Sequence, residues 1–223
     1  MSALVRYQAA LLLRSQRWLP PLLCFVLVLG IGVAGDEPLM DSLAFGGALL
    51  VPITAWYVRC TLTADPPQAR ACLVAAVGAA RVQLASLVVA LGVGLVLAGA
   101  TVGACWAVCG RTVADPTRSV PRGEALLAGV PVVLSCVLTG LVVGALSHRP
   151  VLLRGSYGIL AVLGLSMLML LLPGVPANSA VRALETGSQQ VRVSYPLLAP
   201  LLAALLAVVV AAGTAALAGR RTE

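Results

Sequence analysis

Six cysteines and one histidine are the side chains of this chain best suited to metal binding or thiol chemistry. The cysteines are Cys24, Cys60, Cys72, Cys105, Cys109 and Cys136, and no two of them form a CxxC pair. Cys105 and Cys109 lie four residues apart and would share one helix face, but no His or carboxylate lies close in sequence to complete a metal site. Most of the cysteines fall in apolar runs, where Cys packs as a small hydrophobe. We therefore expect neither a metal centre nor a disulfide framework.

Catalytic motifs are absent from the sequence. It contains no GxxxxGK[ST] phosphate loop, no HExxH and no GxSxG. The single histidine, His148, stands beside Arg149 in a short polar stretch, where contact with a lipid headgroup is a better interpretation than catalysis. The centres of the apolar runs contain no charged residue, which argues against a transporter driven by protons or ions. We expect no catalytic, metal or cofactor site in this chain, and we do not expect it to be an enzyme.

The composition is that of an integral membrane protein. Of 223 residues, 60% are hydrophobic and 10% are charged, whereas a soluble domain has roughly 25% charged residues. The mean hydropathy is +1.02. All fifteen basic residues are arginines, and the net charge is +7. Because these arginines are scattered singly between apolar runs, they predict anchoring at lipid headgroups and no nucleic-acid partner.

Six apolar runs meet or approach the roughly 17 to 25 residues that a helix needs to cross a bilayer. We therefore predict an all-α protein with a single transmembrane domain over residues 1–223. The first run has no convincing cleavage site, so we expect it to remain in the mature protein. Two spans carry small residues four apart, Gly99 and Gly103 in one and Cys136, Gly140 and Gly144 in another, which favours close helix packing. The predicted spans are residues 18–35, 42–59, 83–108, 125–147, 155–173 and 197–218.

The distribution of arginines predicts the orientation, because cytoplasmic loops of membrane proteins hold an excess of them. With the N-terminus inside, most arginines and few acids fall on the cytoplasmic side. We therefore expect a multi-pass protein of the plasma membrane with both termini cytoplasmic. The sequence offers no role for the outer loop 110–123, which contains Arg111, Arg118 and Arg122. The predicted inner arginines are Arg6, Arg14, Arg17, Arg59, Arg70, Arg81, Arg149, Arg154, Arg220 and Arg221.

Residues 3–17 predict an amphipathic helix that precedes the first span. On a helical wheel Arg6, Arg14 and Arg17 share one face, and apolar side chains occupy a broad opposite face. This pattern is typical of a helix that lies in the membrane interface. A simple positively charged anchor for the first span is the alternative interpretation.

Between the second and third runs, the stretch TADPPQARACLVAAVGAARVQL predicts a short helix that is not a span. Asp65 is a suitable N-cap, Pro66 suits the first helical position, and Gln68 stands where a capping-box partner belongs. Gly78 is placed to end the helix in a left-handed conformation. The ten residues from Gln68 to Val77 would form a rod of roughly 15 Å, which is too short to cross a membrane.

A second short helix is predicted before the last span. Asn178 or Ser179 would cap it, the stretch from Ala180 to Thr186 would form it, and Gly187 would end it. This element would lie on the outer face. It would either shield that end of the bundle or gate an exit.

This arrangement of an interfacial helix, six spans and two short helices resembles the permease subunits of the type-2 class of ATP-binding cassette (ABC) exporters. The resemblance covers nearly the whole chain and rests on architecture. It implies that the short helix after the second span is a coupling helix that docks in a groove of a separate ATPase subunit, with the N-terminal helix as a second contact region. The residues in these roles would be Asp65, Pro66, Pro67, Gln68, Ala69, Arg70 and Leu73, and Arg6, Arg14 and Arg17.

The resemblance also implies a dimer, with a second permease copy or a diverged permease chain, in which the second and fifth spans of both chains enclose a transport path. ATP and Mg²⁺ would bind the partner ATPase, and this chain would bind no cofactor. An apolar path without buried charge would suit a hydrophobic or amphipathic cargo such as a peptide antibiotic, drug or lipid. The residues offered to this path are Phe45, Thr54, Trp56, Tyr157, Ser166, Met167 and Met169.

A second reading remains open. The same helices could belong to a membrane protein that binds a partner without transporting anything, such as an immunity, assembly or sensor subunit.

Overall fold

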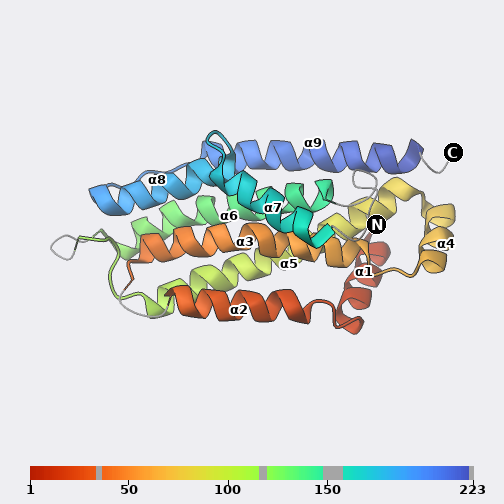
Figure 1. Ribbon diagram of the computed structural model, residues 1–223, viewed down its shortest axis with the longest axis horizontal. Coiled ribbons are helices and arrows are strands. Elements are labelled where there is room, and N and C mark those ends of the chain that lie inside the picture. The colour runs from red at the N-terminus through yellow and green to blue at the C-terminus, as the bar shows by residue number, and fades with distance from the viewer. Residues whose placement is uncertain (34–36, 116–119, 148–157, 221–223) are drawn as a thin grey trace.

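The computed structural model describes residues 1–33, 37–115, 120–147 and 158–220, and every regular element in this part of the chain is a helix. The helices lie along the long axis of the molecule, apart from α1 and α4, which turn away at one end (Figure 1). Predictions that involve His148, Arg149, Arg154, Tyr157, Arg118 and Arg221 lie outside the described residues. The helices are α1 Ser2–Arg14, α2 Leu19–Val33, α3 Leu39–Leu62, α4 Pro67–Val77, α5 Ala79–Val108, α6 Arg122–Leu146, α7 Gly158–Leu171, α8 Pro176–Gln190 and α9 Leu198–Arg220.

Four of the described helices, α3, α5, α6 and α9, are long and apolar enough to cross a membrane unaided. Two bent pairs, α1 with α2 and α7 with α8, pass the same test together, with bends of 74° and 52°. The chain is therefore a multi-pass membrane protein with four candidate spans, or up to six if each bent pair counts as one. α2 and α7 have only 15 and 14 residues, fewer than a straight crossing of the hydrocarbon needs.

The core of the bundle forms around α3, which packs against α6 and α5 and also contacts α2, α7 and α8. Gly140 and Gly144 allow α6 to approach α3 closely. A Cβ added at Gly140 would lie 2.6 Å from the Val51 carbonyl oxygen, and one added at Gly144 would lie 2.9 Å from the Ala55 carbonyl oxygen. The small-residue stripe predicted on this span is therefore a helix–helix contact, as small residues between membrane helices usually are.

The second predicted stripe, Gly99 and Gly103 on α5, is not such a contact. Apart from the adjacent residues and the nearby backbone of α5 itself, no described atom lies within 4 Å of a Cβ added at either glycine. Spacing alone predicts that two residues share a helix face, but it does not say which face meets a neighbour.

The two ends of the bundle differ in what they contain. α1, α4 and the last turns of α9 lie at one end, which we call the α4 end (Figure 1). The loop 109–115 and α8 lie at the opposite end, which we call the α8 end (Figure 1).

The N-terminal helix is shorter than predicted. α1 ends at Arg14 and not at residue 17, because Gln16 takes a left-handed conformation with φ of 54°. This residue interrupts the helix where the chain turns by 74° into α2.

The helix before the last span is longer than predicted and differently capped. α8 begins at Pro176 after the extended N-cap Val175, so neither Asn178 nor Ser179 caps it. Proline suits the first turn of a helix, which explains the earlier start. The helix continues through Gly187, where it was predicted to end, to Gln190, and its C-cap is Val191 in a left-handed conformation.

Candidate partner-docking site

The helix α4 projects from the end of the bundle between two long helices. Four residues separate the end of α3 at Leu62 from the start of α4 at Pro67, and only Gly78 separates α4 from α5. Gly78 has φ of 88° and ψ of 145°, a backbone region that side-chain-bearing residues rarely adopt. It therefore ends α4 with a positive φ, as predicted, but its ψ lies outside the left-handed helical region.

Arg70 holds α4 against the bundle. Its guanidinium Nη1 donates to the Leu62 carbonyl oxygen at 2.8 Å, and its Nη2 donates to Gln83 Oε1 at 3.3 Å. Gln83 is buried near the start of α5. One side chain thus joins the end of α3, the middle of α4 and the first turns of α5. Arg70 was predicted to contact a partner, and within this chain its guanidinium is a structural anchor.

The anchored side of α4 is opposite an outward face of small side chains. Arg70 and Leu73 are half-buried, whereas residues on the other side of the helical wheel are exposed. Among the predicted contact residues of α4 whose exposure the structure describes, only Gln68 belongs to this outward face, and Ala69 lies at its edge. Sequence reasoning missed the other members, because a helical wheel shows which residues share a face but not which face meets the bundle. The outward face comprises Gln68, Ala71, Cys72, Ala75 and Ala76.

The predicted capping of α4 by Asp65 is wrong. The N-cap is Pro66, no side chain caps the helix, and Pro67 occupies the first turn. The physical reason is that a residue before proline is driven to extended backbone, so Pro66, which precedes Pro67, cannot start the helix. Pro66 has φ of −58° and ψ of 145°, which is extended. Gln68 therefore has no capping-box partner.

Asp65 instead joins the link before α4 to α1. Its Oδ2 accepts a hydrogen bond from Gln8 Nε2 at 2.7 Å, and Gln8 is only 1% exposed. Partial burial and the negative charge of Asp65 together raise the pKa of Tyr7 on the same helix. The N-terminal helix and the link before α4 are thus connected through one carboxylate.

A second set of hydrogen bonds fixes the turn between α1 and α2 against the end of α3. Arg17 Nη1 donates to the Thr63 carbonyl oxygen at 2.6 Å, and Tyr57 Oη donates to the Trp18 carbonyl oxygen at 2.9 Å. Arg6 and Arg14 are exposed on α1. Of the predicted second contact region, Arg6 and Arg14 therefore present their charges outward, while Arg17 also has a structural role.

The residues proposed for a transport path face different neighbours. The ring of Phe45 lies beside Gly32 of α2. Thr54 is fully buried between α5 and α6, next to Gly94 and Gly140. Trp56 packs on the cluster that joins α1 to α5.

The path residues of the fifth predicted span also diverge. Ser166 is buried and its hydroxyl donates to the Val162 carbonyl oxygen at 2.6 Å. Met169 packs near Ala55, whereas Met167 is 62% exposed. Within one chain these side chains do not converge on a shared point, and a second copy would be needed to bring the α3 and α7 sets of two chains together.

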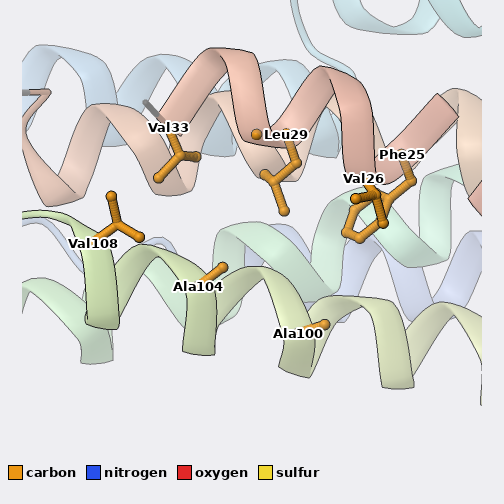
Figure 2. A pocket seen from close by; sticks show the side chains of 8 residues that line it. Phe25, Val26, Leu29, Val33, Ala100, Ala104 and Val108 are labelled. Carbon is orange, nitrogen blue, oxygen red and sulfur yellow. The ribbon is translucent and has the colours of Figure 1, made fainter. Parts of the chain in front are cut away.

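A groove lies between α2 and α5 on the side of the bundle. Its volume is about 510 Å³, and its walls are entirely aliphatic or aromatic. Figure 2 shows Phe25, Leu29 and Val33 of α2 above Ala100, Ala104 and Val108 of α5. Its lining offers no group for chemistry, but an apolar chain would fit it. Sequence reasoning missed this groove; the four-residue spacing of Ala100 and Ala104 was the available signal.

The loop 109–115 has a structural role at the α8 end. The carbonyl oxygens of Arg111 and Thr112 accept the backbone N–H groups of Leu39 and Met40, which begin α3. Arg122 donates to the carbonyl oxygens of Cys109 and Gly110, and its guanidinium lies 5.8 Å from the centre of the Trp106 ring. This loop, for which the sequence suggested no purpose, therefore caps α3 and closes the end of α5.

Metal chemistry has no candidate cluster in the described part of the chain. No group of three or more His, Cys, Asp or Glu side chains there is arranged to hold a metal ion. Cys109 Sγ lies 3.3 Å from Ser42 Oγ, where it donates a weak hydrogen bond, and Cys105 is buried.

Comparison of this chain with protein-family models, curated proteins and solved structures gave no match.

Proposed function

We propose that this chain is the membrane-spanning subunit of an ATP-driven exporter of the ABC type, and that a separate ATPase subunit docks on the outward face of α4. ATP and Mg²⁺ would bind that partner. A second permease chain, identical or diverged, would complete the transport path. The chain would lie in the plasma membrane with the α4 end and both termini in the cytoplasm.

The observation that carries the proposal is that α4 is anchored to the bundle on one side and exposes mainly small side chains on the opposite, outward face. Arg70 fixes the helix to α3 and α5 through two hydrogen bonds. The outward face carries no Trp, Phe or Leu, the residues by which interfacial helices enter lipid. Small exposed side chains instead allow close approach by the backbone and side chains of a protein partner. A helix anchored in this way would transmit a conformational change of the partner to the helices of the bundle.

The charge distribution supports a cytoplasmic position for the α4 end. Among described residues the only acid on the elements of that end is Asp65, which is already bonded to Gln8. The α8 end contains most of the described acids. An excess of arginine is typical of cytoplasmic segments. The described arginines on elements of the α4 end are Arg6, Arg14, Arg17, Arg59, Arg70 and Arg81.

The apolar groove between α2 and α5 supports a cargo with a hydrophobic part. A groove of about 510 Å³ without polar groups would select against a small, fully polar substrate. Transport of an amphipathic peptide, drug or lipid is therefore the form of the proposal, and transport of a small polar solute alone would contradict it.

Cys72 provides a native probe of the α4 surface, because it is exposed, whereas Cys60, Cys105, Cys109 and Cys136 are buried. We expect a membrane-impermeant maleimide to label Cys72 in inverted membrane vesicles and not in intact cells. A Cys72→Ser variant gives the background from the half-buried Cys24. Labelling from the outside of intact cells would place α4 on the wrong side and refute the proposal.

The docking face is tested with an ABC ATPase from the same genome, co-expressed with this chain. The bound ATPase should shield Cys72 from maleimide. Ala71→Arg and Ala75→Arg should abolish both co-purification and this shielding, because a long charged side chain would separate the two surfaces. Gln189→Arg, an exposed change on α8 at the opposite end, is the matched control and should have no effect. Co-purification unaffected by both alanine variants would mean that α4 is not the docking surface.

The anchor is tested separately by Arg70→Gln. This change should preserve the outward face but loosen α4, so the ATPase should still bind while cargo-dependent ATP turnover falls. A chain that never binds an ATPase but remains folded would instead favour the alternative of a membrane partner protein without transport activity.

A further inference from the structure

A second hollow lies at the α8 end, between α8 and the segment that returns from it to α9. Its volume is about 370 Å³, and six of the eight residues that line it have polar side chains, whereas every residue that lines the groove between α2 and α5 is apolar. Along α8 the lining residues recur at helical spacing, and the returning segment supplies the other wall. The lining consists of Ser179, Arg182, Ala183, Thr186, Gly187, Gln190, Arg192 and Ser194.

Backbone contacts hold the two walls of this hollow together. The Arg192 N–H donates to the Gly187 carbonyl oxygen at 2.9 Å, and the Ser194 hydroxyl donates to the Ala183 carbonyl oxygen at 3.3 Å. Gly187 is required for this approach, since a Cβ there would lie 2.6 Å from the Arg192 carbonyl oxygen. The positions of both arginines are thus fixed at the backbone, independently of any ligand.

The lining offers hydrogen-bond donors and positive charge, with no acid. Neither guanidinium, of Arg182 or Arg192, has a hydrogen bond or ion pair within the described residues. Thr186 and Gln190 add a hydroxyl and an amide. Glu185, the nearest acid in sequence, stands about 60° around α8 from Arg182, on the side away from the lining face. Two unpaired guanidinium groups beside hydroxyls match an anion with several oxygens, above all a phosphate.

An exposed apolar surface begins directly beyond the hollow. Leu198, Leu201 and Leu205 on α9 are 75%, 66% and 62% exposed and follow one side of the helix toward the α4 end. A ligand that fits both surfaces has an anionic phosphate head and a hydrocarbon tail. We propose that the groove of α8 and the return segment binds the headgroup of an anionic phospholipid, with an acyl chain along α9. This proposal requires only that the chain spans a membrane, and it does not depend on export.

The test is retention of lipid by the purified full-length chain, measured by native mass spectrometry with phosphatidylglycerol and with phosphatidylcholine of the same acyl chains. Phosphatidylglycerol should be retained preferentially, because the choline ammonium is repelled by the arginines. Arg182→Gln combined with Arg192→Gln should weaken phosphatidylglycerol binding by about thirtyfold, from the loss of two arginine–headgroup attractions. The double lysine variant should retain part of the preference. Unchanged melting of each variant shows that the fold is intact.

The matched control removes two arginines at the other end, Arg6→Gln with Arg14→Gln, and should leave the retained lipid in place. Equal losses in both double variants would mean that lipid binding is diffuse, which would overturn the proposal. The same conclusion follows if the two lipids are retained equally. An excess of inorganic phosphate should not displace the lipid, because it lacks the tail; complete displacement would show an anion site that does not recognise lipid.

Discussion

Replacing Gly140 by alanine tests whether the close contact between α6 and α3 stabilises the bundle. The added Cβ would lie 2.6 Å from the Val51 carbonyl oxygen and 2.9 Å from Thr54 Cβ. The first of these is a backbone atom in the middle of a packed helix, so the two helices must separate. Overpacking of this kind costs about 1–3 kcal/mol.

Gly99→Ala on α5 is the matched control, because it makes the same chemical change where, apart from the adjacent residues and the nearby backbone of α5, no described atom lies within 4 Å of the new Cβ. Both substitutions gain the same helix propensity, about 1 kcal/mol. The difference between the two variants therefore isolates the contact, and we expect Gly140→Ala to be less stable than Gly99→Ala by about 1–3 kcal/mol.

The assay is thermal unfolding of both purified variants in the same detergent. At about 2–4 °C per kcal/mol for a chain of this size, the melting temperature of Gly140→Ala should lie roughly 2–12 °C below that of Gly99→Ala. Equal melting temperatures would refute the assignment of α3 and α6 as the tightly packed pair. Gly103→Ala should behave like Gly99→Ala and serves as a second control.

Two further predictions concern the α4 end. The pKa of Tyr7 is raised above the usual value of 10.0, first by burial and then by Asp65. The ionisation of Tyr7 can be followed by an absorbance titration from which the titration of Tyr7→Phe is subtracted. In Asp65→Asn this ionisation should shift to lower pH. Because the folded-state pKa is raised, the stability contributed by Tyr7 is present below pH 10 and is lost as the pH rises above it; an unchanged titration in Asp65→Asn would contradict the placement of α1. Separately, Gln16→Gly should raise the melting temperature by relieving a left-handed residue, a gain of up to about 1 kcal/mol, whereas Ser15→Gly, at φ of −75°, should lower it.

The apolar runs were sufficient to predict an all-helical membrane protein, because the length of a span and its composition are both imposed by the bilayer. Termini of helices were predicted less well. The missed start of α4 was decided by Pro66 standing before Pro67, a rule that acts locally and was available from the sequence. The missed end of α8 was decided by Val191, a β-branched residue in a left-handed conformation that no local preference favours.

Partners of single side chains were beyond the reach of the sequence. Asp65 has a good capping environment in sequence, but it bonds Gln8, which lies 57 residues away. Arg70 likewise finds acceptors on two other helices. Such choices depend on where α1 and α5 dock, and this is fixed by packing of the whole bundle. The outward face of α4 became visible only once the inward face was known.

Gly78, the single residue between α4 and α5, joins a short helix to a helix nearly three times as long. At about 1.5 Å per residue, the eleven residues of α4 measure roughly 16 Å and the thirty residues of α5 roughly 45 Å. If the two helices turned together about Gly78 by about 10°, the end of α4 at Pro67 would move roughly 3 Å and the far end of α5 roughly 8 Å, by the same helix lengths. A small displacement of α4 would thus be nearly tripled at the α8 end. This end of α5 lies beside the loop 109–115, which caps the start of α3.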